Sequence, residues 1–180
     1  MRKHLLWFVL GGAACASSNP VPDTAATTSH TITIAGMGGK LTVNSTSNPI
    51  TSNLASTVDE VWRALPAAFD SLGVKVTVND PAQHIIGNER VKIRVQLGRT
   101  PLSRYLECGG TQIGANADSY EVVLTALTQV QSVAAGGSML TTLFEAMAKP
   151  IAISQGYSKC SSKGLFESRL LDLVKKQLPR

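Results

Sequence analysis

Residues 57–80 read TVDEVWRALPAAFDSLGVKVTVND, and their pattern predicts a helix followed by a strand. Thr57 and Glu60 have the spacing of a capping box, in which side chains bind free amides at the start of a helix. Apolar residues then recur every three or four positions, which predicts a helix over 57–72 with one apolar stripe. Gly73 suits the left-handed residue that ends such a helix. The stripe consists of Val58, Val61, Trp62, Leu65, Phe69 and Leu72.

Alternation of apolar and polar residues predicts strands on both sides of this helix. Before the helix, residues 31–44 indicate a hairpin with a glycine turn. After it, residues 74–78 predict a short strand, residues 84–89 predict a short strand or bulge that contains Gly87, and residues 90–97 predict a longer strand. In the longer strand, Val91, Ile93, Val95 and Leu97 are expected to face one way, and Arg90, Lys92, Arg94 and Gln96 the other.

The last third of the chain predicts a long hairpin and a final helix. Residues 119–150 alternate on both sides of an AAGG turn at 134–137, although a helix over 139–148 is an alternative because of its Ala, Met, Leu and Glu content. A helix is expected over 163–178, with Phe166, Leu170, Leu173, Val174 and Leu178 as its stripe. The predicted fold is therefore α+β, an antiparallel sheet packed against helices at about 57–72 and 163–178.

The first 16 residues have the order of a secretory signal peptide. Arg2 and Lys3 give a positive start, the apolar run Leu5–Leu10 follows, and small residues come next. The apolar run is too short to span a membrane, which takes about 20 residues. We therefore expect export to the bacterial envelope, with residues 1–16 as the signal, 17–29 as a polar linker that contains two prolines, and 30–180 as a single domain.

Two cleavage patterns compete at the end of the signal. Ala14, Cys15 and Ala16 fit a site that releases the protein into the periplasm. Alternatively, the run from Gly12 to Cys15 resembles a bacterial lipobox, in which Cys15 becomes the lipidated first residue. That reading would anchor the domain to a membrane.

Either route removes Cys15 from the pool of free thiols and leaves Cys108 and Cys160 of the three cysteines. Outside the cytosol, an even pair most simply forms a disulfide. The rival interpretation is a metal site or a catalytic thiol. It lacks ligands, because the mature chain offers only His30 and His84 and no C-x-x-C motif. We expect a Cys108–Cys160 disulfide, no metal and no cofactor.

A basic set is the candidate binding surface. Lys and Arg exceed Asp and Glu by five, and removing Arg2 and Lys3 with the signal lowers the formal charge to +3. Such a mild surplus, without a dense Lys/Arg run or a known motif, argues against nucleic-acid binding. The residues expected to bind an anion or a partner are Arg90, Lys92, Arg94, Arg99, Arg104 and Tyr105. The competing interpretation is a solvated strand face, on which charges discourage edge pairing.

The segment 103–107 is the alternative site. Ser103 and Glu107 lie just before Cys108, and a disulfide-anchored loop often carries binding residues. A secreted hydrolase that uses this loop is therefore the alternative function. The sequence shows no G-x-S-x-G elbow and no partner base for Ser103. We accordingly expect no catalytic activity.

Residues 55–97 resemble the helix-grip domains of bacterial envelope lipoproteins, such as the lipoprotein C component of the outer-membrane β-barrel assembly machinery. The resemblance is carried by the helix with Trp62, Leu65 and Leu72, by the following Gly73, Val76 and Asp80, and by the order of helix, strand, IIG and basic strand. It implies a non-catalytic domain that binds or scaffolds in the envelope. The expected partner is an envelope protein complex, an anionic lipid or a glycan. No partner-binding residue carries over from that family.

Overall fold

A computed structural model describes residues 30–36, 39–45, 49–134 and 136–179. The expected signal sequence, Cys15 and the linker 17–29 lie outside the described residues. Among the helices that the structure describes, none is long and apolar enough to cross a membrane.

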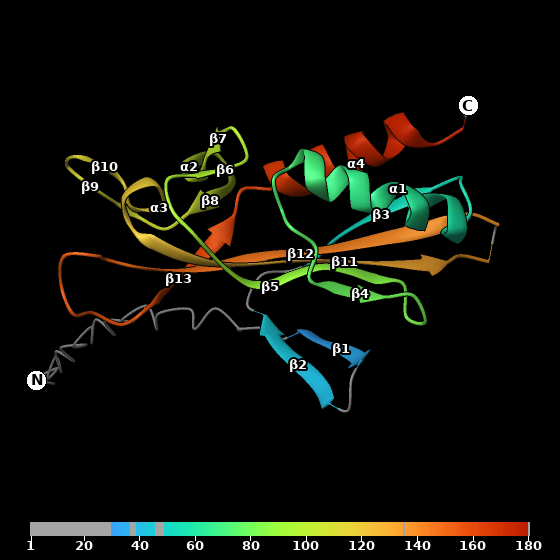
Figure 1. The fold of residues 1–180 in the computed structure, drawn as a ribbon, viewed down its shortest axis with the longest axis horizontal. Coiled ribbons are helices and arrows are strands. Elements are labelled where there is room, and N and C mark those ends of the chain that lie inside the picture. Colours follow the sequence, from blue (N-terminus) through green and yellow to red (C-terminus); the bar gives the residue numbers. More distant parts are fainter. Residues whose placement is uncertain (1–29, 37–38, 46–48, 135, 180) are drawn as a thin grey trace, which may run out of the picture.

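The centre of the fold is an antiparallel sheet of seven strands (Figure 1). The long hairpin of β11 and β12 forms its middle, and β5 and then β4 extend it beyond β11. The other edge of β12 is shared by β3 at one end and β13 at the other, and β8 pairs with β13. The strands are β3 (Ile50–Leu54), β4 (Val78–Asp80), β5 (Ile85–Ile93), β8 (Leu106–Glu107), β11 (Glu121–Ser132), β12 (Ser138–Lys149) and β13 (Ser158–Ser162).

Two helices, α1 (Val58–Ser71) and α4 (Leu165–Gln177), cover one face of this sheet (Figure 1). The predicted α+β class is therefore confirmed. The capping box at the start of α1 is present, because the Thr57 hydroxyl accepts from the Glu60 amide and the Glu60 carboxylate accepts from the Thr57 amide.

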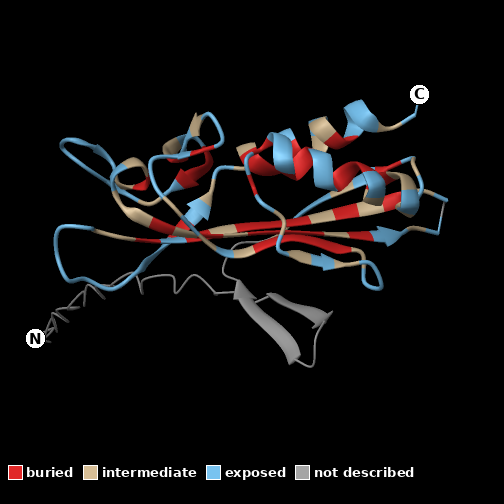
Figure 2. Ribbon diagram, viewed as in Figure 1, coloured by how far each residue is buried: buried red, intermediate tan, exposed pale blue. Residues whose placement is uncertain are grey.

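The core lies between the sheet and the two helices, where Figure 2 shows the buried residues concentrated. The rings of Phe144 from β12 and Phe166 from α4 stack with centroids 4.2 Å apart, and Phe69 from α1 packs against Phe166. Even-numbered residues of β11 and β12 belong to this core. Odd-numbered residues of the two strands therefore lie on the opposite, helix-free face of the sheet.

Residues 139–148 belong to strand β12 and not to a helix. The intrinsic helix propensity of these residues does not decide their structure, because β12 is hydrogen-bonded along both edges. Strand β11 pairs with one edge, and β3 and β13 pair with the other. Alternate side chains of β12 also enter the core. Tertiary burial and ladder pairing outweigh a propensity difference of under about 1 kcal/mol per residue.

The strand predicted over 90–97 ends at Ile93. The register against β11 shifts between Leu124 and Ala126, where β5 holds one extra residue, and Arg90 has a left-handed φ of 58°. Val95, with φ of 67°, then turns the chain away from the sheet. The strand predicted over 74–78 is wrong for all but its last residue, since β4 spans Val78–Asp80 and residues 74–77 are not in a strand.

Residues 96–119 form a side lobe that the sequence patterns did not predict. It lies beside α4, on the helix side of the sheet (Figure 1). Its buried hydrophobic residues are Leu97, Leu102, Tyr105, Leu106 and Ala117. Besides β8, its elements are β6 (Gln96–Leu97), β7 (Thr100–Pro101), α2 (Leu102–Tyr105), β9 (Gly110–Thr111), β10 (Gly114–Ala115) and α3 (Asn116–Ser119).

The predicted N-terminal hairpin is present as β1 (His30–Gly36) and β2 (Gly39–Ser45). These strands form a two-stranded sheet of their own and are not part of the seven-stranded sheet. In Figure 1 the hairpin lies on the side of the large sheet opposite α1 and α4.

Candidate binding surface

A row of four residues crosses the helix-free face where β5, β11, β12 and β13 run side by side. Lys92 pairs with Val123, Val123 with Met147, and Met147 with Lys159. Residues paired across neighbouring strands share a face, so two exposed lysines flank two apolar side chains. Three strand spacings of about 4.8 Å place the backbones of Lys92 and Lys159 about 14 Å apart.

The loop between β12 and β13, residues 150–157, continues this surface beyond the end of the sheet. Its sequence, PIAISQGY, contains two isoleucines that remain 50 % and 61 % exposed, Ile151 and Ile153. Figure 2 shows the loop as a largely exposed segment next to the strand ends. Two large exposed aliphatic residues within one short loop are a candidate contact site.

Lys149, Glu121 and Tyr157 form a polar cluster at the base of this loop. The Tyr157 hydroxyl donates a hydrogen bond to the Glu121 carboxylate, and Lys149 Nζ lies 3.4 Å from Glu121 Oε1. Lys149 Nζ also lies 4.9 Å from the centre of the Tyr157 ring. These contacts fasten the start of β11 to the end of the loop.

The same contacts shift three pKa values. The hydrogen bond from Tyr157, and then the contacts with Lys149, lower the pKa of Glu121. The hydrogen bond to Glu121 and its negative charge raise the pKa of Lys149. The hydrogen bond to Glu121 likewise raises the pKa of Tyr157. At neutral pH, Glu121 is therefore charged, Lys149 is charged and Tyr157 is a neutral donor.

We call this region the lysine surface. It comprises Lys92, Val123, Met147, Lys149, Ile151, Ile153, Tyr157 and Lys159. It combines cations with exposed aliphatic side chains at one end of the sheet, an arrangement suited to an anionic, partly apolar partner.

The structure disperses the six residues expected to form one basic surface. Lys92 lies on the lysine surface. Arg90 sits at the bulge of β5, and Arg94 follows the end of that strand, so neither continues the alternation that the sequence suggested. Both are exposed.

Arg99 and Arg104 belong to the side lobe, which lies on the helix side of the sheet. Arg99 follows Gly98 in a turn that touches the end of α1, where a Cβ on Gly73 would meet Gly98 Cα at 2.7 Å. Arg104 is exposed on α2. These two arginines therefore lie on the opposite side of the sheet from the lysine surface.

The expectation that Tyr105 is a surface binding residue is wrong. Its side chain is only 1 % exposed and packs against Phe144 and Phe166. The sequence could not reveal this, because the short helix α2 that turns Tyr105 inward has no apolar period of its own.

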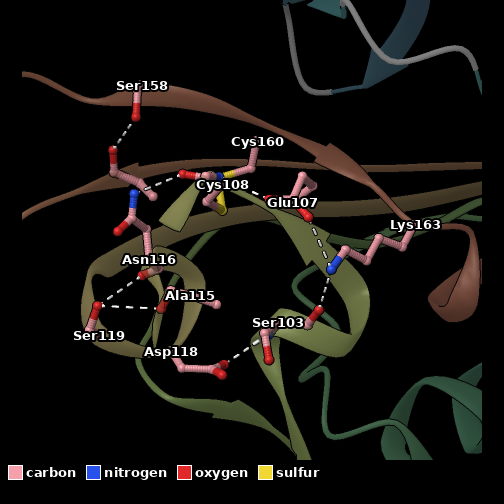
Figure 3. The surroundings of a disulfide bond; sticks show 12 residues. Ser103, Glu107, Cys108, Ala115, Asn116, Asp118, Ser119, Ser158, Cys160 and Lys163 are labelled. Carbon is pink, nitrogen blue, oxygen red and sulfur yellow. Dashed lines mark hydrogen bonds and ion pairs between the residues drawn. A yellow bond between two sulfur atoms is a disulfide. The ribbon is translucent and has the colours of Figure 1, made fainter. Parts of the chain in front are cut away.

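Cys108 and Cys160 form a disulfide that ties the side lobe to the sheet (Figure 3). Cys160 lies on β13, opposite Ala146, and Cys108 follows β8. The Asn116 side chain donates a 3.1 Å hydrogen bond to the Cys108 carbonyl, which adds α3 to the same joint.

Ser103 and Glu107 contribute to this joint through structural contacts (Figure 3). Lys163 Nζ donates to the Ser103 carbonyl at 2.8 Å and lies 3.2 Å from Glu107 Oε2. The Ser103 amide donates to Asp118 Oδ1 at 2.8 Å. In the part of the chain that the structure describes, the hydrogen bonds of Ser103 are thus made by its backbone, and no base contacts its hydroxyl.

Sequence reasoning missed most of the lysine surface. Lys149, Met147 and Lys159 lie on strands β12 and β13, far along the chain from Lys92, and only the strand order brings the four together. One local signal was present, since PIAISQGY places isoleucines between a proline and a glycine, where a polar loop is normal.

Within the described ranges, no group of three or more His, Cys, Asp or Glu side chains is arranged to hold a metal ion. Comparison with protein-family models and with curated proteins yields no match to this chain.

Proposed function

We propose that this chain is an exported, non-catalytic domain of the bacterial cell envelope that binds anionic membrane surfaces through the lysine surface. The main support for this proposal is that three lysines and two exposed isoleucines belong to one end of the sheet. They are Lys92, Lys149, Lys159, Ile151 and Ile153. The resemblance of residues 55–97 to envelope lipoproteins supports the same location.

The physical terms favour weak, reversible binding. A lysine near an anionic bilayer contributes about 1 kcal/mol, and this attraction falls off within a Debye length. Burying the exposed half of each isoleucine among acyl chains contributes about 1 kcal/mol more. Lys149 contributes less than the two exposed lysines because Glu121 already neutralises it.

A lipid anchor would bring this surface to the membrane. Acylation of Cys15 would place the linker 17–29 between the anchor and the folded part, and 13 flexible residues span about 20 Å. One lipid chain plus a basic patch is a typical two-part membrane signal. The intact mass of the protein from its host membrane fraction tests the cleavage site, the acyl groups and the disulfide together.

The binding test uses a Cys15→Ala chain, which cannot be acylated at that position, so that any contribution of the N-terminal segment is common to all variants. We expect sedimentation with vesicles containing phosphatidylglycerol and phosphatidylcholine, less sedimentation with phosphatidylcholine alone, and release at high salt. Lys92→Gln with Lys159→Gln should weaken the anionic binding. Ile151→Ser with Ile153→Ser should weaken it with little change in its salt dependence.

Arg99→Gln with Arg104→Gln is the matched control. It removes the same charge from the helix side of the sheet and should leave vesicle binding unchanged. Equal loss in the lysine and arginine pairs would mean that net charge alone drives binding, and the lysine surface would be rejected. Preference for a soluble anionic glycan or a protein over vesicles would likewise contradict a lipid partner.

A further inference from the structure

A second loop with an exposed isoleucine lies at the end of the sheet that carries the lysine surface. It is the hairpin of β9 and β10 in the side lobe, and Ile113 at its two-residue turn is 95 % exposed. Residues 109–117, GGTQIGANA, contain no charged side chain. The loop 150–157, which holds Ile151 and Ile153, is likewise uncharged. Both loops thus display aliphatic side chains without neighbouring charges that would favour water.

The strand register places both loops at the same end of the sheet. Glu121 begins β11 and pairs with Lys149, the last residue of β12. The β9–β10 hairpin leads to Glu121 through the short helix α3, and the loop 150–157 leaves directly from Lys149. In Figure 1 both loops project from that end, and the hairpin lies on the side of the helices. The two isoleucine-bearing loops are therefore separate projections from one end of the molecule.

The β9–β10 hairpin is fastened at its base (Figure 3). Cys108 is bonded to Cys160 of β13. The Asn116 amide donates a 3.0 Å hydrogen bond to the Gly109 carbonyl, and the Asn116 side chain donates to the Cys108 carbonyl. A loop that is already fixed loses less conformational entropy on binding than a flexible one. Ile113 is therefore presented in a preformed position.

The lysines lie at a depth that suits a membrane at this end of the sheet. Lys149 ends β12, and the row that contains Lys92 and Lys159 lies two residues further inside the sheet. Two strand residues span about 7 Å. The polar layer on each side of a bilayer's hydrocarbon core is about 5–8 Å thick. The lysines therefore fit among the headgroups when the two loops beyond them reach the acyl chains.

We infer that the protein docks end-on onto anionic membranes, with Ile113 and the loop 150–157 as two separate contacts with the bilayer. This inference rests on the proposed function and adds the side lobe to the binding surface. Docking through the flat sheet face alone would leave Ile113, on the helix side, in water. Arg99 and Arg104 lie in the part of the lobe that contacts the end of α1 and α4, so they are set back from the bilayer.

The first test measures how the Cys15→Ala chain partitions onto vesicles of phosphatidylglycerol and phosphatidylcholine. Ile113→Ser should lower the partition coefficient about tenfold, as expected when one large aliphatic side chain is no longer buried. Ile50→Ser is the matched control, because Ile50 is 42 % exposed on β3, which pairs with the other half of β12. The control should leave the partition coefficient unchanged. Neither substitution should alter thermal unfolding, since both side chains are exposed.

The second test measures insertion directly. On addition of vesicles, the Ile113→Trp chain should gain an emission at shorter wavelength that lipids brominated in their acyl chains quench. Ile50→Trp should gain neither change. Both are compared with the chain that keeps the two isoleucines, so that its native tryptophans are common to all three samples.

The outcomes separate this inference from the proposed function. Unchanged partition of Ile113→Ser, with a loss in Ile151→Ser, Ile153→Ser, would overturn end-on docking and leave membrane binding by the lysine surface in place. Equal losses in Ile113→Ser and Ile50→Ser would overturn it as well, because overall hydrophobicity would then drive partition. A dimer in solution that Ile113→Ser disrupts would assign the hairpin tip to a second copy. Failure of the Cys15→Ala chain to bind anionic vesicles would reject both proposals.

Discussion

Arg169 Nη1 donates a 2.8 Å hydrogen bond to the hydroxyl oxygen of Tyr105. The same nitrogen lies 2.8 Å from Thr100 Oγ1. Arg169 stands on α4, and the other two residues belong to the side lobe, so one guanidinium joins the helix to the lobe. With the disulfide at the lobe's other attachment, this contact fixes a region that has little regular secondary structure of its own.

Tyr105→Phe should destabilise the protein by about 1.5 kcal/mol, because it removes the acceptor for a charged donor while keeping the packing of the ring. Urea denaturation followed by circular dichroism measures the change. Tyr157→Phe is the matched control, since its hydroxyl bonds to Glu121 at an exposed site. The control should change stability much less than Tyr105→Phe does, because substitutions at exposed positions have small effects. Equal effects of the two substitutions would contradict the anchoring role of Tyr105.

Gly87→Ala should destabilise the protein by about 3 kcal/mol or more, because it combines overpacking with a strained backbone. Gly87 has φ of 147°, and an added Cβ would come within 3.0 Å of Leu127 Cα and closer still to the Ala126 carbonyl of β11. Gly156→Ala should be neutral, because nothing lies within 4 Å of its added Cβ. Thermal unfolding of both variants compares them, and tolerance of Gly87→Ala would contradict the close contact of β5 and β11.

Reduction of the Cys108–Cys160 bond should lower stability by about 4 kcal/mol in the chain-entropy treatment, for a loop of 52 residues. Denaturant unfolding with and without a reductant measures this difference. Hydrogen exchange should then accelerate first in the side lobe, which β8 joins to β13 by only two residue pairs. Equal exchange rates in the lobe before and after reduction would show that its non-covalent contacts are sufficient to keep the lobe folded without the disulfide.

Glu121 should titrate at lower pH than an ordinary glutamate, whose pKa is 4.5. A lowered folded-state pKa gives a stability contribution that is present above the unfolded-state pKa and is lost as the pH falls through the folded-state value. Carboxyl NMR of the folded protein measures the midpoint. Because the hydrogen bond from Tyr157 is the largest cause, Tyr157→Phe should raise the pKa of Glu121 more than Lys149→Gln does. The opposite order would show that the charge of Lys149 dominates.

The local spacing of apolar residues correctly predicted the elements that bury one regular face. The helix at 57–72 appears as Val58–Ser71, and the helix at 163–178 appears as Leu165–Gln177. The long hairpin turns where the glycines predicted it. In these elements the period of the apolar residues and the burial in the fold agree, so propensity and packing favour the same structure.

The spacing of apolar residues did not predict the structure where the buried residues follow no regular period. The side lobe is held by scattered buried residues and a disulfide, and no regular apolar spacing in the sequence predicts such an arrangement. The strand after Arg90 follows alternation in the sequence, but the bulge and the turn at Val95 interrupt it in space. A bulge depends on the partner strand, which a local window does not include.

The sequence by itself determined the α+β class and the two amphipathic helices, because each helix is encoded by apolar spacing within about 20 residues. The structure decided between strand and helix for residues 139–148 of the central hairpin. Only the tertiary structure decided that Lys92 and Lys159 flank the same apolar pair, that Tyr105 is a core residue, and that buried leucines line the face away from the helices. These relationships depend on strand order and register, and those are set by packing between segments that lie far apart along the chain.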